Sequence, residues 1–243
     1  MNKTVEVVPE QAALIQRSLD LILSKMETAI QERGLFTIAL SGGSTPKPIY
    51  EAIATRSLPW DKIHVFWGDE RYVPPDDPDS NYLMARRAWL DQVDIPDSNI
   101  HPMPTDAADP AVAARKYEEH LREFFQTTVG DFPALDLILL GMGDDGHTAS
   151  LFPHTEALKV RDQLITVGNK DSQPRITFTA PFINQGRCVM FVVAGANKRP
   201  ALAQVFAPVA DDLTYPSRLI KPQGELWWLL DLAAGQDLKL DNK

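Results

Sequence analysis

Residues 135–153, LDLILLGMGDDGHTASLFP, hold the side chains of this chain that are best suited to chemistry. An apolar run of strand length leads into a loop with three glycines, two aspartates and then His147. Such runs are typical of buried strands in α/β sheets, where ligands bind outside the carboxyl ends of the strands. Because a histidine can exchange a proton near neutral pH, we expect His147 to act as a general base. Asp145 is the candidate acid that orients it.

A metal site is a second interpretation of the same loop, with Asp144, Asp145, His147 and His154 as ligands. None of the usual zinc spacings occurs among them, and one histidine beside two adjacent aspartates is a poor set of ligands. We therefore predict no metal. A loop histidine that bonds only to its own turn stays open as the simpler alternative.

A second loop, SGGSTPK at residues 41–47, is a candidate phosphate-binding loop. Glycines let the backbone approach an anion, and a helix beginning near Pro46 would direct free N–H groups to the same point. The loop has neither the GxxxxGK(S/T) spacing of a nucleotide P-loop nor the GxSxG spacing of a nucleophile elbow. A plain turn capped by Ser44 or Thr45 fits the local sequence equally well. The candidate phosphate ligands are Ser41, Gly42, Gly43 and Ser44.

Three cations and one acid in other loops are candidate partners of an anionic substrate. Arg71, in the segment GDERY, carries a guanidinium fork suited to phosphate, and Asp69 is suited to a sugar hydroxyl. Lys198 lies in AGANKR, directly after an apolar run, and Arg175 opens the run RITFT. The alternatives are a salt-bridged surface turn for Arg71 and a structural salt bridge for Arg175.

The spacing of apolar residues predicts the elements that position these loops. Apolar residues recur with helical spacing from residue 14 to residue 30, and Gly34 is placed to end that helix. Asn81 and Asn197 are suited to cap later helices, which we expect of Asn81 in preference to ligand binding. The expected strands are 35–40, 63–67, 135–140, 164–167, 175–179, 188–193 and 225–230; further helices are expected after Pro46 and near 82–90, 110–126 and 198–206.

Alternation of strands and helices predicts one α/β domain over residues 1–243, a Rossmann-like three-layer sandwich. We expect a mostly parallel sheet with helices on both faces. Little helix lies between the strands of residues 160–195, which predicts a small antiparallel portion there. If the strands that precede the four candidate loops are neighbours and parallel, the loops meet at one edge of the sheet and form a single crevice.

Composition excludes several classes of protein. The formal net charge of −9 argues against a nucleic-acid binder, since such proteins need a basic face. No apolar run is long enough to span a membrane, and the start MNKTVEVVPEQ lacks the apolar centre of a signal peptide. We therefore expect a cytoplasmic protein without a membrane partner. Cys188 is the only cysteine, and its apolar neighbours predict a buried, inert thiol.

Taken in order, the motifs SGGSTP, GDERYVP with the following DSNY, GMGDDGHTASLFP and AGANKR resemble those of the 6-phosphogluconolactonase family. The resemblance runs from about residue 10 to about residue 232, and the combination is specific although SGGSTP alone is not. The related glucosamine-6-phosphate deaminases share the phosphate loop and the DGH, but carry a glutamate shortly afterwards in an FNEP-like segment. This chain has Phe152 and Pro153 there, without an acid, and it has Arg71 where the deaminase loop lacks an arginine. Both departures favour the lactonase.

The resemblance implies hydrolysis of 6-phospho-D-glucono-1,5-lactone in the oxidative pentose phosphate pathway, without a required cofactor or metal. It implies that His147 is the general base, that Asp145 is its neighbouring acid, and that residues 41–44 hold the phosphate together with Arg71 and Lys198. The only partner expected is the sugar-phosphate substrate. Two alternatives stay open, a glucosamine-6-phosphate deaminase and a non-catalytic sugar-phosphate sensor. We expect a monomer and leave a dimer open.

Overall fold

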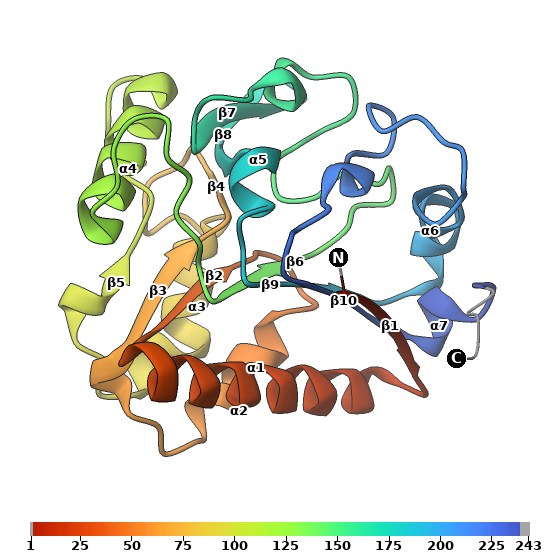
Figure 1. Ribbon diagram of the computed structural model, residues 1–243, viewed down its shortest axis with the longest axis horizontal. Coiled ribbons are helices and arrows are strands. Elements are labelled where there is room, and N and C mark those ends of the chain that lie inside the picture. Colours follow the sequence, from red (N-terminus) through yellow and green to blue (C-terminus); the bar gives the residue numbers. More distant parts are fainter. Residues whose placement is uncertain (1, 239–243) are drawn as a thin grey trace.

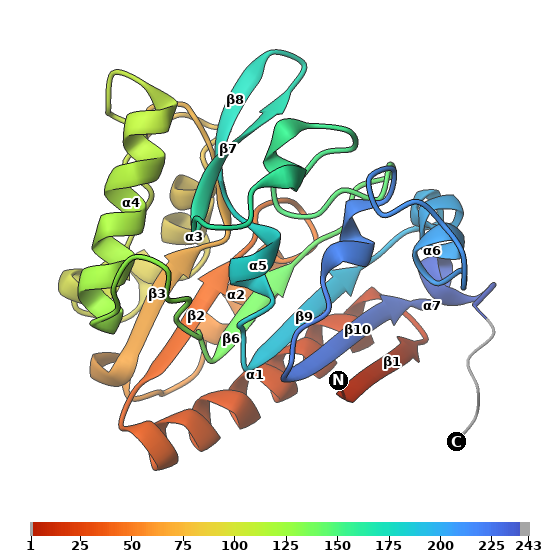
Figure 2. The ribbon, with the colours of Figure 1, turned by 45° about the horizontal axis from the view of Figure 1, so that its top comes forward.

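Seven strands form a sheet in the order β1, β10, β9, β6, β2, β3, β5, and each adjacent pair is parallel (Figure 2). The computed structural model describes residues 2–238. Strands β2, β6 and β9 are buried along their whole length, which explains why they are continuous apolar runs in the sequence. The strands are β1 Asn2–Val8, β2 Phe36–Leu40, β3 Ile63–Trp67, β5 Ile100–His101, β6 Leu137–Leu140, β9 Cys188–Val193 and β10 Glu225–Asp231.

Helices cover both faces of this sheet, as the sequence predicted. Figure 1 shows α1 and α2 beneath the sheet and α4 and α5 above it. Gly34 ends α1 in the left-handed conformation, with φ of 81°, and donates its N–H to the Ile30 carbonyl. No helix within residues 2–238 is long and apolar enough to cross a membrane. The helices are α1 Gln11–Arg33, α2 Lys47–Ala54, α3 Asn81–Ala88, α4 Pro110–Phe125, α5 Ala180–Ile183, α6 Arg199–Val205 and α7 Leu232–Gly235.

A second, antiparallel sheet stands over one end of the first and has the order β4, β8, β7 (Figure 1). Strands β7 (Ile165–Lys170) and β8 (Gln173–Phe178) confirm the antiparallel portion that the sequence predicted. Strand β4 (Asp69–Arg71) corrects the interpretation of its residues as loop. Three consecutive charged residues carry no strand pattern of their own, and they become a strand by pairing with β8.

Cys188 is 3% exposed in β9, and burial raises the pKa of its thiol to about 12. The expectation of a buried thiol is confirmed, and such a thiol is unreactive at neutral pH.

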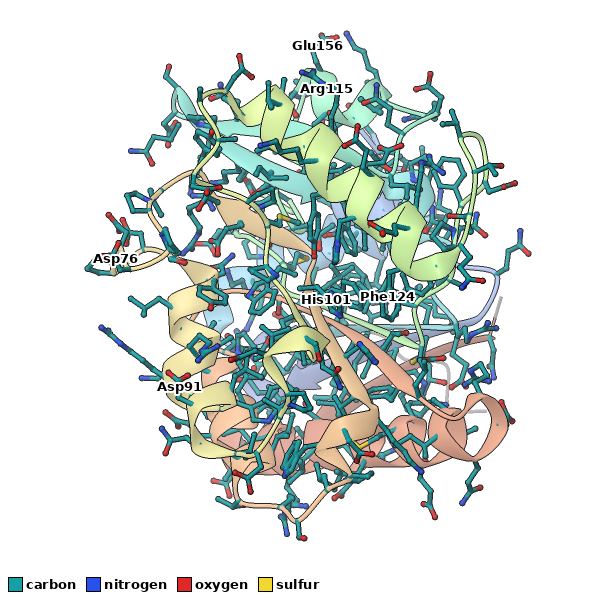
Figure 3. The ribbon with its side chains drawn as sticks, turned by 90° about the vertical axis from the view of Figure 1, so that its left-hand side faces the viewer. Asp76, Asp91, His101, Arg115, Phe124 and Glu156 are labelled. Carbon is teal, nitrogen blue, oxygen red and sulfur yellow. The ribbon has the colours of Figure 1, made fainter. Side chains whose placement is uncertain are left out.

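Three histidines link β3, β5 and α4 at the edge of the sheet. His101 Nε2 lies 3.1 Å from His64 Nδ1, and His101 Nδ1 lies 2.8 Å from His120 Nε2. The His101 ring stacks on Phe66 and meets Phe124 edge-on; Figure 3 shows His101 and Phe124 side by side beneath α4. Each nitrogen pair shares one proton, so the chain of rings is satisfied when His101 is neutral.

We expect this histidine chain to make the fold sensitive to acid. Burial, followed by the neighbouring His120 and His64, lowers the pKa of His101 from an ordinary 6.5 to about 3. A lowered pKa means that the contribution to stability is present above pH 6.5 and is lost as the pH falls toward 3. The urea concentration at the midpoint of unfolding should therefore decrease when the pH is lowered from neutral to about 4.5. The decrease should be smaller in His101→Phe. Equal pH slopes for the two proteins would contradict this.

Candidate active site

The strands β9, β6, β2 and β3 are adjacent and parallel, so the loops after them meet at one edge of the sheet. A cavity of about 250 Å³ lies between these loops. Asp145 lies behind His147 and outside the cavity lining. The expected site residues that line the cavity are Ser41, Gly42, Gly43, Ser44, Asp69, Arg71, His147, Arg175 and Lys198.

His147 and Asp145 form a hydrogen-bonded pair in the loop after β6. Asp145 Oδ1 lies 2.5 Å from His147 Nδ1 and also accepts from the His147 backbone N–H at 3.0 Å. Burial raises the pKa of Asp145, but these bonds outweigh it and the pKa is lowered to about 2. An ionised Asp145 favours the proton on Nδ1, and His147 then has a free lone pair on Nε2. The imidazole face also packs on Phe152, with ring centres 4.5 Å apart.

Gly143 is required for this pair to form. A Cβ at Gly143 would lie 2.0 Å from His147 Nδ1 and 2.6 Å from Asp145 Oδ1. The pair therefore packs directly on the Gly143 backbone, whose N–H donates to the His147 carbonyl. The turn is built around a position where no side chain fits.

The segment around the 3₁₀ turn Pro216–Leu219 supports this loop from outside. Ser217 donates its N–H and its hydroxyl to the Gly146 carbonyl, at 2.9 and 2.8 Å. The Tyr215 ring covers Gly146, which has φ of 79°. These contacts hold the backbone between the two aspartates and His147 in one conformation.

The glycine-rich loop after β2 is also fixed from below. The buried Tyr50 hydroxyl donates to the Ser41 carbonyl at 2.8 Å and accepts from the Ser41 N–H at 3.0 Å. Gly43 has φ of 103°, a conformation that favours glycine. Helix α2 begins after Pro46, and no side chain caps it. The simpler interpretation, a turn capped by Ser44 or Thr45, is therefore wrong.

Arg71 and Arg175 lie directly opposite each other on the paired strands β4 and β8. Neither has a carboxylate within salt-bridge distance among residues 2–238, and the Nε of each is buried without a hydrogen-bond partner. Burial lowers the pKa of Arg175, with Asp69 opposing and Arg71 adding to that effect. Like charges directly opposite are unfavourable, so the pair is suited to an anion in the cavity. The salt-bridge interpretations of both arginines are wrong.

Glu70 positions the neighbouring helix α3. Its buried carboxylate accepts from the backbone N–H groups of Asn81 and Tyr82 at 2.8 and 2.7 Å, and from Ser80 Oγ at 3.2 Å. Burial raises the pKa of Glu70, while these N–H bonds oppose the rise. The carboxylate therefore accepts from N–H groups at the N-terminus of α3 that have no partner within the helix.

Asn81 is a residue of the site that the sequence interpretation missed. Ser80 is the cap of α3, accepting from the Leu83 N–H, so the expected cap at Asn81 is wrong. The Asn81 amide instead lines the cavity, with Nδ2 donating to the Asp69 carbonyl at 2.9 Å. Its Oδ1 has no hydrogen-bond partner among residues 2–238 and packs on Gly42, where a Cβ would lie 1.9 Å away. The sequence offered one signal for this role, a second polar residue, Asn81, directly after the cap Ser80.

Asp69 and Ser150 connect β4 to the loop after β6. Ser150, fully buried after the DGH motif, donates its hydroxyl to Asp69 Oδ2 at 2.7 Å. Its backbone N–H donates to Thr177 Oγ1 on β8 at 3.1 Å. Asp69 is thus held at the cavity wall by the loop that carries His147, a role for Ser150 that its sequence position alone did not indicate.

Lys198 reaches the cavity from the 3₁₀ turn Ala196–Lys198 after β9. Its ammonium group pairs with Asp144 Oδ1, which also accepts from Asn197 Nδ2 at 2.9 Å. Asn197 is therefore a partner of the loop after β6, and the expectation that it caps the following helix is wrong. Within the described residues 2–238, no group of three or more His, Cys, Asp or Glu side chains is arranged to hold a metal ion.

Comparisons with known proteins agree with this geometry. The family model "Glucosamine-6-phosphate isomerases/6-phosphogluconolactonase" matches residues 9–228. The chain belongs to this family. It is 74% identical to a 6-phosphogluconolactonase of Nostoc sp. over 99% of this chain and 100% of that one, and 64% identical to a Synechocystis sp. 6-phosphogluconolactonase over 98% and 100%. The solved 6-phosphogluconolactonase of Trypanosoma cruzi superposes with a TM-score of 0.90 at 28% identity, covering 99% of both chains.

We expect Gly143→Ala to disable the site of this family member without unfolding the chain. The added methyl would displace the His147 ring and the Asp145 carboxylate, and displacements near 1 Å cost about 10²-fold in rate. The control is Gly68→Ala, where the added Cβ would lie 3.5 Å from the Leu40 carbonyl, an ordinary contact. The measurements are kcat for a lactone substrate and thermal unfolding. Wild-type kcat in Gly143→Ala would show that the pair is unimportant.

Proposed function

We propose that this chain hydrolyses 6-phospho-D-glucono-1,5-lactone to 6-phosphogluconate, with His147 as the general base. The proposal rests above all on one observation. His147, whose Nδ1 is bonded to Asp145, lines the same cavity as Arg71 and Arg175, and these two arginines have no carboxylate partner among residues 2–238. Names of relatives that are 64% and 74% identical support the substrate class. The resemblance of the four motifs supports a reaction in the oxidative pentose phosphate pathway, and we propose a cytoplasmic monomer.

The phosphate of the substrate occupies the cationic part of the cavity. The glycine-rich loop, with Ser41 and Ser44, supplies backbone and hydroxyl donors, and Arg71, Arg175 and Lys198 supply charge. Binding energy at the phosphate then orients the lactone carbonyl toward the loop after β6. Asp69 faces the sugar between these ends, with its Oδ2 already bonded to Ser150.

His147 activates water at the other end. Nε2 takes a proton from water as the water oxygen attacks C1, and Asp145 stabilises the resulting imidazolium through Nδ1–H. The tetrahedral intermediate then breaks its bond from C1 to the ring oxygen, which receives the proton back from Nε2. The product carboxylic acid releases its own proton to solvent. The N–H groups of Gly143 and Gly146 already donate within the turn, so the oxyanion donors are other groups.

The alternatives are less well supported by the site. Phe152 follows the DGH where the deaminases carry a glutamate, and its ring packs on His147, so no acid partners the imidazole there. A non-catalytic sensor has no need of a histidine that is bonded through Nδ1 and faces the cavity through its other side. Release of ammonia from glucosamine 6-phosphate would favour the deaminase, and binding without turnover would favour the sensor.

His147→Ala should lower kcat for freshly prepared 6-phosphogluconolactone by about 10²–10⁴-fold and change KM little, because general-base catalysis acts on the transition state. His154→Asn is the matched control, since His154 is exposed and lies outside the cavity lining. Steady-state hydrolysis, corrected for spontaneous decay, measures both. A kcat within twofold of wild type would remove His147 as the base.

Arg71→Gln should weaken binding of 6-phosphogluconate by about tenfold or more, since a charge-assisted bond to phosphate contributes about 1.5–3 kcal/mol. Titration calorimetry measures the affinity. The exposed Arg56→Gln, outside the cavity lining, controls for the loss of one positive charge. Equal affinities for wild type and Arg71→Gln would mean that the phosphate binds elsewhere.

A further inference from the structure

Lys198 differs from the two arginines of the cavity in having a carboxylate partner. Its ammonium group is paired with Asp144, whereas Arg71 and Arg175 have no such partner among residues 2–238. Asp144 adjoins Asp145 in the loop after β6, but it is absent from the cavity lining and makes no bond to His147. The His147–Asp145 pair and the Lys198–Asp144 pair are therefore separate contacts of one turn.

The Lys198–Asp144 contact is made with an accessible carboxylate. The side chain of Asp144 is 63% exposed, and that of Lys198 is 20% exposed at the cavity wall. Hydrogen bonds from Lys198 and then Asn197 lower the pKa of Asp144, with burial opposing, so it is ionised in neutral solution. An exposed pair of this kind is weak and is easily exchanged for a more highly charged partner. A phosphate dianion in the cavity is such a partner.

We infer that Asp144 sets the affinity of the site by competing with the anionic ligand for Lys198. This inference rests on the proposed function, because it takes the ligand to be a sugar phosphate. When the cavity is empty, the Asp144 carboxylate accepts from the Lys198 ammonium group. When the ligand binds, this ammonium group must leave Asp144 or divide its N–H bonds between Asp144 and the ligand. Each anionic ligand is therefore bound less tightly than the three cations alone would allow.

The competition acts most strongly on the product. Hydrolysis adds water across the bond from C1 to the ring oxygen and creates a carboxylate, so the product carries one more negative charge than the lactone. Lys198 attracts this added charge less while it is paired with Asp144, so the pairing weakens binding of the product more than binding of the lactone. Asp144 thus favours release of the acid and limits inhibition by product, without contact with the reacting atoms.

Calorimetric titration with 6-phosphogluconate tests this. We expect Asp144→Asn to bind about two- to fivefold more tightly than wild type, the size set by a partly exposed ion pair. The gain should vanish when Asp144→Asn is combined with Lys198→Ala, because Asp144 and the ligand then have no ammonium group for which to compete. Asp94→Asn, an exposed carboxylate outside the lining, removes the same charge and should leave the affinity unchanged.

A change of affinity in the opposite direction, or no change, would overturn the inference. Weaker binding by Asp144→Asn would show that Asp144 positions Lys198 for the ligand, and would overturn the inference. Unchanged binding, or a gain that persists without Lys198, would overturn it too. Absence of any binding by the wild type would instead overturn the proposed function, on which the inference depends.

Discussion

Parallel pairing of β9, β6, β2 and β3 is the constraint on which the rest of the site depends. Residues from position 41 to position 198 contribute to one cavity because each of these strands ends at the same edge. An antiparallel neighbour would carry its loop to the opposite edge. Every residue of β2 is buried, so its side chains pack on both faces of the sheet. A slip of one residue would move each side chain to the opposite face and would shift the loop after the strand. The packing of the core therefore determines where the loops that line the cavity lie.

A second layer of polar contacts makes the cavity rigid. Tyr50 holds the backbone of Ser41, Glu70 holds the start of α3, and Ser217 holds Gly146. The contacts of Tyr50 and Ser217 each join one loop to an element outside the four strands, and the contact of Glu70 joins β4 to α3. In a chain with a net charge of −9, the pairing of β4 with β8 keeps two guanidinium groups together, and neither has a carboxylate partner among residues 2–238. The protein is anionic overall, whereas Arg71, Arg175 and Lys198 line its cavity, and such a local cluster lets a negatively charged protein attract an anion.

Much of this could be predicted from sequence because it follows from local pattern. Buried parallel strands are continuous apolar runs, and the loops after them contain many of the residues that line the cavity. What could not be predicted depends on partners distant in the chain. Strand β1 is a half-exposed edge strand, β5 has two residues, and β4 is the charged segment Asp69–Arg71 that needs β8. The side chains of Asn81 and Asn197 were misassigned for the same reason, because their partners, Asp69 and Asp144, lie in other loops.

We propose that one cavity binds a phosphate at one end and activates water at the other. A crystal structure with 6-phosphogluconate bound tests it most directly. The phosphate is predicted to lie on the glycine-rich loop with Arg71, Arg175 and Lys198, and the C1 carboxylate within hydrogen-bond reach of His147 Nε2. A phosphate at His147, or a ligand outside this cavity, would contradict the account.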